Sequence, residues 1–334
     1  MPKYPKVNYI GNKEKLVDWI ISELPVKKGK ILDIFSGGCS VSYALKKAGY
    51  SVISNDSLYA NYVIGKALIE NSDEILNTDI FDVKPTEERI KIIRRQIDFL
   101  NNRLYFDYEV DELAHLIAIS ESLNGYKQFI FLSLLRRAMI RKLPYSRMNV
   151  PWNQITLLRD EEYSYKKYKR RRAYHNQTFE SHMRENIIEY NNSIFKGLDC
   201  KVYNCDAFEL VNKIDSVDVI YLDPPYPSTM NNYDAFYGLF DKMFGMENSH
   251  IDFTKKSNFL NRLESLIKLY LKKTKYIVLS LNSNVNPNPK EILDMLEKYG
   301  KVTVKEKAHV YKVTGKENKN VTKELLFILE LDNN

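Results

Sequence analysis

The sequence has 334 residues, 44% of them hydrophobic, and a formal net charge of +7. This length suffices for one large domain or two unequal ones, and the three cysteines, which have neither a zinc spacing nor an even count, predict reduced thiols and no metal site. No apolar run approaches the ~18 residues of a membrane-spanning helix, and the N-terminal residues lack the apolar core of a signal peptide, so we expect a cytoplasmic protein with no membrane partner.

The first predicted element is a helix over residues 14–24. Its apolar face is formed by Leu16, Ile20, Ile21 and Leu24. The preceding segment, Tyr9-Ile10-Gly11-Asn12-Lys13, is either a glycine turn that leads into this helix or part of a binding site. The residues alone favour the turn.

A strand over residues 31–35 is followed by the tight turn Ser36-Gly37-Gly38, which opens a helix that runs to Lys47. This succession is typical of nucleotide-binding sites, because glycines let a ligand approach the backbone and a helix N-terminus offers N–H donors. The pattern is not GxGxxG, which disfavours a dinucleotide pyrophosphate. An ordinary strand-to-helix turn is the alternative.

The next predicted strand covers residues 50–54 and ends at Asn55-Asp56, about 20 residues beyond the glycines. A carboxylate at this place can accept hydrogen bonds from both hydroxyls of a ribose, so Asp56 is the candidate ribose ligand. A helix over residues 58–70 follows.

The alternation of strands and helices stops between residues 73 and 196. Helical patterns cover 87–102, 111–122 and 128–142 and lead into a basic, tyrosine-rich stretch without clear periodicity. An excursion of this length inside an α/β fold predicts an inserted domain. We place the insertion at residues 76–196, between the two parts of a main domain at 1–75 and 197–334.

The positive charge is concentrated in this excursion. Residues 136–184 hold 13 Arg or Lys against four acids, a net of +9, so the rest of the chain carries about −2. Charge confined to one segment predicts a polyanion partner, and the planar and polar groups between the cations suit nucleic-acid recognition. The residues concerned are Tyr145, Arg147, Asn149, Trp152, Asn153, Tyr163, Tyr165, Tyr168 and the run Lys169-Arg170-Arg171-Arg172. A solvated charged face is the alternative.

Strands resume at residues 201–204, followed by Cys205-Asp206-Ala207-Phe208 and a helix to Lys213. Asp206 either binds a ligand or caps that helix. Further on, four aromatic residues with helical spacing are assigned to the core: Tyr233, Phe236, Tyr237 and Phe240. Later strands are expected at 275–281, 301–311 and 324–331.

The most informative stretch is VDVIYLDPPY, residues 217–226. Its apolar run predicts a buried central strand, and Pro224 and Pro225, which cannot donate hydrogen bonds to a sheet, end the strand at Asp223. Asp223 therefore lies at the carboxyl end of the strand, where open α/β sheets bind ligands.

This arrangement suits the methylation of an exocyclic amine on a base that has left the stack. The amine is a poor nucleophile, because its lone pair is delocalised into the ring. If Asp223 and the carbonyl of Pro224 each accept one N–H, the lone pair can turn toward an electrophilic methyl group, and Tyr226 can stack on the base. A carboxylate of ordinary pKa does not deprotonate such an amine outright.

Asp223-Pro224-Pro225-Tyr226 resembles the catalytic motif of S-adenosylmethionine-dependent amino-group methyltransferases, in the form typical of the adenine-N6 DNA enzymes, and residues 227–240 resemble the FokI-type and Dam-like members. The resemblance implies an α/β, Rossmann-like methyltransferase fold with an inserted, mainly helical target-recognition domain. It also implies S-adenosylmethionine as the cofactor. The order of the motifs, cofactor elements before the catalytic one, matches the alpha arrangement of this family.

The resemblance also implies roles for individual residues. The cofactor site comprises Tyr9, Gly11, Asn12 and Lys13 beside the methionine end, Asp33, Phe35, Ser36, Gly37 and Gly38 in the loop, Asp56 at the ribose, Asp206, Ala207 and Phe208 at the adenine, and Asp223. The implied catalytic residues are Asp223, Pro224, Pro225 and Tyr226. DNA contacts are expected from Arg147, Asn149, Lys169, Arg170, Arg171 and Arg172, and from Asn231, Asn232 and Tyr233 in the loop after Tyr226.

The implied function is site-specific methylation of adenine N6 in duplex DNA, which protects host DNA from a cognate restriction endonuclease. We expect a monomer that modifies one strand of a non-palindromic site. Two alternatives remain open. An RNA base N-methyltransferase is one, because some ribosomal RNA enzymes carry a related motif, and a non-catalytic nucleic-acid binder on the same fold is the other.

Overall fold

The computed structural model describes residues 2–225, 227, 232–308 and 323–332. The chain forms two compact units. The sheet unit comprises Lys13–Ser57, Gly197–Tyr233 and Asn248–Asn334. The helical unit comprises Met1–Asn12, Leu58–Lys196 and Asp234–Glu247.

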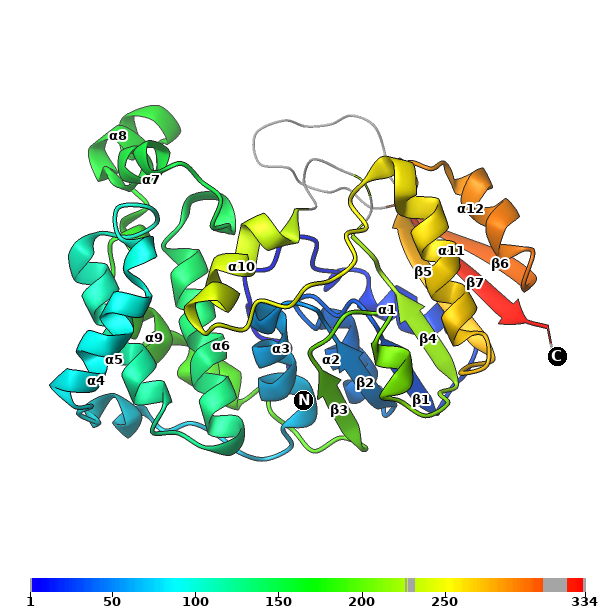
Figure 1. Cartoon of the computed structure of the whole chain (residues 1–334), viewed down its shortest axis with the longest axis horizontal. Coiled ribbons are helices and arrows are strands. Elements are labelled where there is room, and N and C mark those ends of the chain that lie inside the picture. The colour runs from blue at the N-terminus through cyan, green and yellow to red at the C-terminus, as the bar shows by residue number, and fades with distance from the viewer. Residues whose placement is uncertain (1, 226, 228–231, 309–322, 333–334) are drawn as a thin grey trace. The chain divides into compact units, whose positions relative to one another are not determined.

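The sheet unit is built on one sheet, which contains seven strands within the described residues (Figure 1). The strand order is β3-β2-β1-β4-β5-β7-β6. Strands β1 to β5 are parallel to their neighbours in this set, whereas β7 runs antiparallel to both β5 and β6. Their bounds are β1 (Lys30–Asp33), β2 (Ser51–Asn55), β3 (Cys200–Tyr203), β4 (Val219–Leu222), β5 (Tyr276–Asn282), β6 (Gly300–Ala308) and β7 (Lys323–Leu331).

Strand β4 lies in the middle of the sheet, and all four of its residues are buried. A strand covered on both faces needs apolar side chains pointing both ways, which explains the continuous run in its sequence. The strand ends immediately before Asp223, as the two prolines predict. The predicted Rossmann-like α/β fold is thereby confirmed.

Helices cover the sheet on both faces. Figure 1 shows α11 and α12 side by side, and their apolar side chains join those of the central strands in one core cluster. Helices α1 and α2 pack against each other, and α2 contacts β1 and β2. The bounds are α1 (Val17–Glu23), α2 (Ser40–Lys47), α11 (Phe259–Tyr270) and α12 (Pro289–Leu296).

The helical unit is drawn mainly in cyan and green in Figure 1. Its central helix is α6, whose middle is almost wholly buried and which packs against α9 and α3. As predicted, Phe236, Tyr237 and Phe240 of α10 are buried, whereas Tyr233, which we also assigned to the core, is only half-buried because it is the first residue of the helix. The bounds are α3 (Tyr59–Gly65), α4 (Glu87–Gln96), α5 (Asp107–Ser120), α6 (Gly125–Arg141), α7 (Trp152–Arg159), α8 (Glu161–Tyr168), α9 (Phe179–Asn191) and α10 (Tyr233–Met243).

The basic stretch is more ordered than its sequence indicates, because it forms helices α7 and α8. Asp160 joins them, and its side chain accepts the N–H of Tyr163 over 2.9 Å as the N-cap of α8. The hydrophobic period is weak here because α7 anchors itself with the buried cation Arg159 as well as with Ile155 and Leu158. A pattern search for apolar side chains does not register such an anchor.

Other element boundaries also differ from the prediction. The helix expected over 58–70 changes into a π-helical turn at Lys66–Glu70, the one expected over 87–102 ends at Gln96, and the one expected before Lys213 is only the 3₁₀ turn Leu210–Asn212. Part of the strand expected at 301–311 lies outside the described residues.

Residues 58–75 pack in the helical unit, although we assigned them to the main domain. The N–H groups of Tyr59 and Ala60 donate to the two carboxylate oxygens of Asp241 on α10, each over 2.8 Å. These bonds satisfy the free N–H groups at the start of α3. The functional division into 1–75, 76–196 and 197–334 stays a prediction, because compactness alone does not test it.

None of the helices in the described part of the chain combines the length and the apolar composition that a membrane crossing needs.

Candidate functional site

The carboxyl ends of β1 and β4 lie next to each other. Asp33 is in register with Tyr221, and the N–H of Ile34 donates to the Tyr221 carbonyl over 3.2 Å. On its other side β1 pairs with β2, so the chain order reverses between β1 and β4. Open α/β sheets bind ligands at such a switch point. Asp33 and the adjacent Asp223 therefore stand where a ligand is expected.

Asp223 belongs to a buried ionic group. Lys13 Nζ lies 2.6 Å from Glu324 Oε1 and 3.3 Å from Asp223 Oδ1. The exposed fractions of the three side chains are 6% for Lys13, 0% for Glu324 and 19% for Asp223. Burial raises the pKa of Asp223 to about 6, the charge of Lys13 opposes this rise, and the charge of Glu324 adds to it. Asp223 is thus ionised at neutral pH but more basic than an ordinary carboxylate.

Asp33 is a second perturbed acid at the same edge. Its Oδ2 accepts a hydrogen bond from the Ser42 hydroxyl over 2.6 Å, whereas its buried Oδ1 has no hydrogen-bond partner among the described residues. Burial raises the pKa of Asp33 to about 7; the Ser42 bond opposes the rise, and the charges of Asp223 and Asp56 add to it. A buried oxygen without a donor is costly, so a bound ligand with an N–H donor would stabilise it.

The glycine turn has the conformation that its sequence predicts. Gly37 has φ of +50°, in the left-handed region that favours glycine. Its N–H donates to Asp56 Oδ2 over 2.8 Å, and the N–H of Ser36 donates to the carbonyl of Asn55 over 2.9 Å. The turn after β1 and the acid after β2 are therefore brought together. That Asp56 binds a ribose stays a prediction.

Asp206 has a structural task in addition to any ligand contact. Its Oδ1 accepts the N–H of Phe208 and its Oδ2 accepts the N–H of Ile251, each over 2.7 Å. The carboxylate therefore fastens the segment after α10 to the end of β3. It caps no α-helix, because only a 3₁₀ turn follows. The predicted contact with a cofactor adenine is untested by these bonds.

An aromatic group stands beside Asp206. The ring of Phe253 meets Phe35 edge to face at 5.4 Å between centroids and stacks on Phe208 at 6.2 Å. Sequence reasoning included Phe35 and Phe208 but missed Phe253, which lies in a stretch without a motif or a clear period. It also missed Ser42, whose partner Asp33 lies nine residues earlier, and Glu324, whose partner Lys13 lies 311 residues away.

The segment around Tyr9 is held within the helical unit. The Tyr9 ring stacks on Tyr237 at 5.2 Å, and the Tyr237 hydroxyl accepts the N–H of Ile10 over 2.9 Å. Arg136 of α6 donates to the carbonyl of Val7 over 2.9 Å, and its guanidinium lies over the Tyr237 ring. Helices α6 and α10 therefore fix the path of the chain toward Gly11 and Asn12.

The cofactor contacts of Tyr9, Gly11 and Asn12 stay predictions. Lys13, the next residue, lies in the sheet unit beside Asp223. Two predicted site residues, Tyr226 and Asn231, lie outside the described residues. Asn232 is exposed and Tyr233 is half-buried at the start of α10.

Comparison with known proteins identifies the family. Residues 9–295 match the family model described as D12 class N6 adenine-specific DNA methyltransferase. The chain belongs to this family. The type II methyltransferase M2.HphI of Haemophilus parahaemolyticus is 49% identical over 98% of both chains. Type II methyltransferase M.CviAII of Paramecium bursaria Chlorella virus 1 is 25% identical over 91% of this chain and 92% of its own. M.FokI of Planomicrobium okeanokoites is 27% identical over 66% of this chain and 34% of its own.

The match confirms the family that the Asp-Pro-Pro-Tyr motif predicts. The protein is therefore a DNA methyltransferase, and the family as a whole uses S-adenosylmethionine as methyl donor. The chemistry of the strand ends agrees with that donor, because Asp33 offers an unpartnered carboxylate oxygen and Gly37 a backbone without a side chain.

Six of the nine predicted DNA-binding residues of this methyltransferase lie in two places in the helical unit. Arg147 and Asn149 lie in the connection between α6 and α7, where Asn149 is exposed and Arg147 lies over the Tyr145 ring at 5.6 Å. The basic run, Lys169 to Arg172, follows α8, and its first three members are exposed. The Arg171 and Arg172 guanidiniums lie over the rings of Tyr165 and Tyr168. Stacking of this kind pre-orders a cation for contact with a phosphate.

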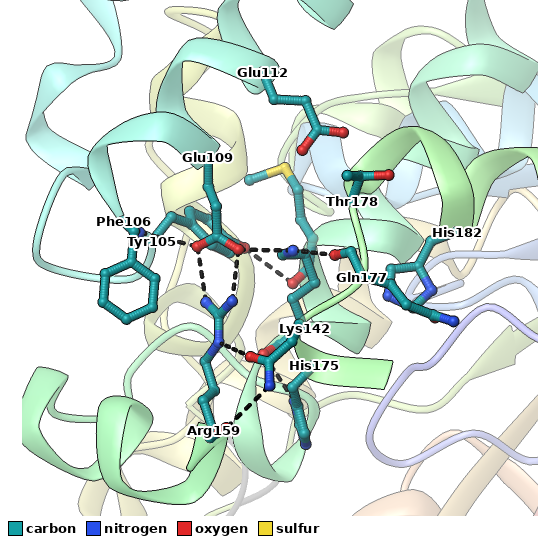
Figure 2. A network of polar contacts seen from close by, with 12 residues as sticks. Tyr105, Phe106, Glu109, Glu112, Lys142, Arg159, His175, Gln177, Thr178 and His182 are labelled. Carbon is teal, nitrogen blue, oxygen red and sulfur yellow. Dashed lines mark hydrogen bonds and ion pairs between the residues drawn. The ribbon is translucent and has the colours of Figure 1, made fainter. Parts of the chain in front are cut away.

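A buried ionic network fastens α7 to the rest of the helical unit (Figure 2). Arg159 at the end of α7 donates two parallel hydrogen bonds to Glu109 of α5, over 2.7 and 2.8 Å. Lys142 approaches the same carboxylate over 2.7 Å and also donates to the carbonyl of Gln177. Burial raises the pKa of Glu109, but the Arg159 bonds and the Lys142 charge outweigh burial, so the net shift is downward.

We expect Glu109→Gln to destabilise the helical unit. The substitution leaves Lys142 and Arg159 buried without their shared counter-charge, which costs about 3 to 5 kcal/mol of unfolding free energy. Urea denaturation measures it. The matched control is Glu121→Gln, which breaks an exposed pair with Arg89 and should destabilise the protein far less, because solvent screens exposed charges. Equal losses for the two variants would show that the network contributes nothing special.

We expect Asp33→Asn to stabilise the protein at alkaline pH while weakening its affinity for S-adenosylmethionine. The folded-state pKa of Asp33 is about 7 and therefore lies above its unfolded value, so the wild type loses stability as pH rises from 4 toward 7. Neutral Asn avoids this loss. The difference in unfolding free energy between variant and wild type therefore grows by about 2 to 4 kcal/mol between pH 4 and pH 8.

Thermal and urea unfolding across that pH range test the stability change, and calorimetry tests the affinity. Exposed Asp294 provides the control, since Asp294→Asn removes the same charge from the surface of α12. A pH-independent difference for Asp33→Asn would contradict the elevated pKa. Unchanged cofactor affinity would contradict the role of its unpartnered oxygen.

Proposed function

We propose that this protein is a site-specific adenine methyltransferase, which transfers a methyl group from S-adenosylmethionine to N6 of an adenine flipped out of duplex DNA. The observation that carries the proposal is the juxtaposition at the switch point. Asp223, followed by Pro224 and Pro225, stands beside Asp33 at adjoining strand ends. Acids at neighbouring strand ends can hold a target base and a cofactor close to each other, and such proximity favours direct transfer between two bound molecules.

The residues proposed to hold the cofactor come from three strand ends. Asp33 suits an ammonium group through its unpartnered oxygen, and Asp56 suits the ribose hydroxyls. The rings of Phe35 and Phe208 are proposed to pack against the adenine ring of the cofactor, together with Phe253, whose ring contacts both of them. When bound, S-adenosylmethionine supplies an electrophilic methyl group on a positively charged sulfur.

Asp223 has two proposed tasks: it orients the target amine, and it accepts a proton from that amine. Its carboxylate and the Pro224 carbonyl each accept one N6–H, which turns the nitrogen lone pair out of the ring plane. As the N–C bond forms and the S–C bond breaks with its electron pair on sulfur, N6 becomes positively charged. Asp223 stabilises that charge and accepts one N6 proton, and the acid then returns the proton to water. Its raised pKa makes it a better acceptor than an ordinary aspartate.

The proposed partner is duplex DNA, bound by the basic run and by the residues between α6 and α7. We further propose a monomer that modifies one adenine on one strand of a non-palindromic site. A single Asp-Pro-Pro-Tyr motif provides one base pocket, and the insertion has no internal repeat. Methylation by such an enzyme protects host DNA from a cognate restriction endonuclease, as the type II relatives indicate.

Strand-resolved mapping of modified bases tests the proposal. DNA from cells that express the protein is compared with DNA from cells that express Asp223→Ala. We expect N6-methyladenine at one position on one strand of a short motif, only with the active protein. Equal modification of both strands of a palindrome would overturn the proposal that the enzyme modifies one strand of a non-palindromic site. Modified cytosine would overturn the choice of base, and modified RNA with unmodified DNA would favour the RNA alternative.

A further inference from the structure

Lys13 is shared unequally between two carboxylates. Its ammonium lies 0.7 Å closer to Glu324 than to Asp223, at 2.6 against 3.3 Å. Glu324 comes from β7, 311 residues away in the chain, and its side chain is fully buried. Ser280 on the neighbouring strand β5 donates to the same Glu324 oxygen over 2.6 Å, so that oxygen is fixed from two sides.

A buried acid is unusual in a strand unless it has a task, since an apolar residue would fill the place without a desolvation cost. The Glu324 carboxylate lies on the same side of the sheet as the catalytic acid Asp223, because the Lys13 ammonium contacts both carboxylates. The group therefore carries two negative charges and one positive charge. Two further titratable groups lie close enough to feel the charge of Asp223, because that charge raises the pKa of buried Asp33 on β1 and of buried Tyr221 on β4.

The geometry has a direct consequence for the target amine. Without Glu324, the Lys13 ammonium would lose the nearer carboxylate and would close to a short ion pair with Asp223. That pair would occupy a carboxylate oxygen that the N6–H needs. It would also lower the basicity of Asp223, which must accept a proton after methyl transfer.

We propose that Glu324 is a positioning residue for methyl transfer, which draws the Lys13 ammonium away from Asp223 and so keeps the Asp223 carboxylate open to the target amine and able to accept its proton. This inference rests on the proposed function. It concerns how the same site is tuned, and it gives Lys13 a task beside the catalytic acid rather than at the cofactor.

The test is the pH dependence of kcat/KM for DNA, measured with S-adenosylmethionine saturating so that Asp33 is engaged. The acid limb of this profile reports the ionisation of Asp223 before DNA binds. For Glu324→Gln we expect this limb to move about one unit toward lower pH, because a like charge is lost and the ion pair tightens. At pH 8 we expect kcat/KM to fall about tenfold, because the acceptor is less basic and partly occupied.

Two variants distinguish a positioning role of Glu324 from a purely structural one. Glu324→Asp retains the charge, so its acid limb should stay at the wild-type pH even if the rate falls. Glu330→Gln removes the same charge from an exposed place on the same strand, where Glu330 pairs with Lys275, and should leave the profile unchanged. Thermal unfolding and S-adenosylmethionine affinity are measured for each protein to establish that it is folded.

A double variant tests whether Glu324 acts on Asp223 through Lys13. In Lys13→Met the ammonium is already absent, so adding Glu324→Gln removes only the like charge of Glu324. The downward shift of the acid limb and the fall in rate at pH 8 should therefore be smaller than those that Glu324→Gln causes in the wild-type background. A Glu324→Gln profile that superimposes on the wild-type one would overturn the proposal. So would a Glu324→Asp profile whose acid limb moves as far toward lower pH as that of Glu324→Gln. If the wild type itself modifies no adenine, the proposed function fails, which is a different result.

Discussion

Asp223→Ala is expected to lose methyl transfer while keeping S-adenosylmethionine bound. The variant lacks the carboxylate that we propose to orient the amine and accept its proton, and removing such a group lowers the rate about 10³-fold or more. The fold should survive, because Lys13 and Glu324 remain as a neutral buried pair at 2.6 Å. Single-turnover transfer of labelled methyl to DNA measures the rate, and calorimetry measures cofactor affinity.

Asp56→Ala provides the contrast. Asp56 accepts the Gly37 N–H and is the proposed ribose ligand, so its loss should weaken cofactor binding, each hydrogen bond to a charged group contributing about 1.5 to 3 kcal/mol. The rate of methyl transfer from bound S-adenosylmethionine should change less than the affinity for S-adenosylmethionine does. Retained activity in Asp223→Ala would end the proposed mechanism, and unchanged affinity in Asp56→Ala would remove that residue from the cofactor site.

Neutralising the basic run should flatten the salt dependence of DNA binding. Each phosphate contact that is lost reduces the slope of log K against log salt by roughly 0.9, so replacing Lys169, Arg170, Arg171 and Arg172 by Gln should reduce it by as much as about 3.6. Three of these side chains are exposed, and Arg172 is half-buried over Tyr168. Fluorescence anisotropy across a salt series measures the slope.

The matched control removes four positive charges elsewhere. Lys27, Lys28, Lys272 and Lys290 are exposed residues of the sheet unit, and their replacement by Gln changes the net charge by the same amount. If both quadruple variants change the slope equally, binding follows net charge rather than a local contact. If the basic-run variant binds like the wild type with its fold intact, the run is a solvated face.

Sequence patterns determined the framework of the catalytic domain. Two prolines end β4 at Asp223, a left-handed Gly37 forms the turn after β1, and a strand end precedes Asp56. Each of these features is encoded within a few neighbouring residues, by a missing N–H, a missing side chain or an apolar run. For that reason the sequence alone could predict the α/β class, the family and the candidate acids.

The surroundings of those acids were decided only by tertiary structure. Lys13 meets Glu324 and Asp223 because β7 inserts next to β5 and brings residue 324 to the edge where β4 ends. Arg159 anchors α7 through Glu109, 50 residues away, which is why the basic stretch showed no period. Such contacts join charges across long separations, and a local pattern carries no record of them. Burial then turns the same contacts into pKa shifts, so the raised pKa values of Asp33 and Asp223 also depend on the folded chain.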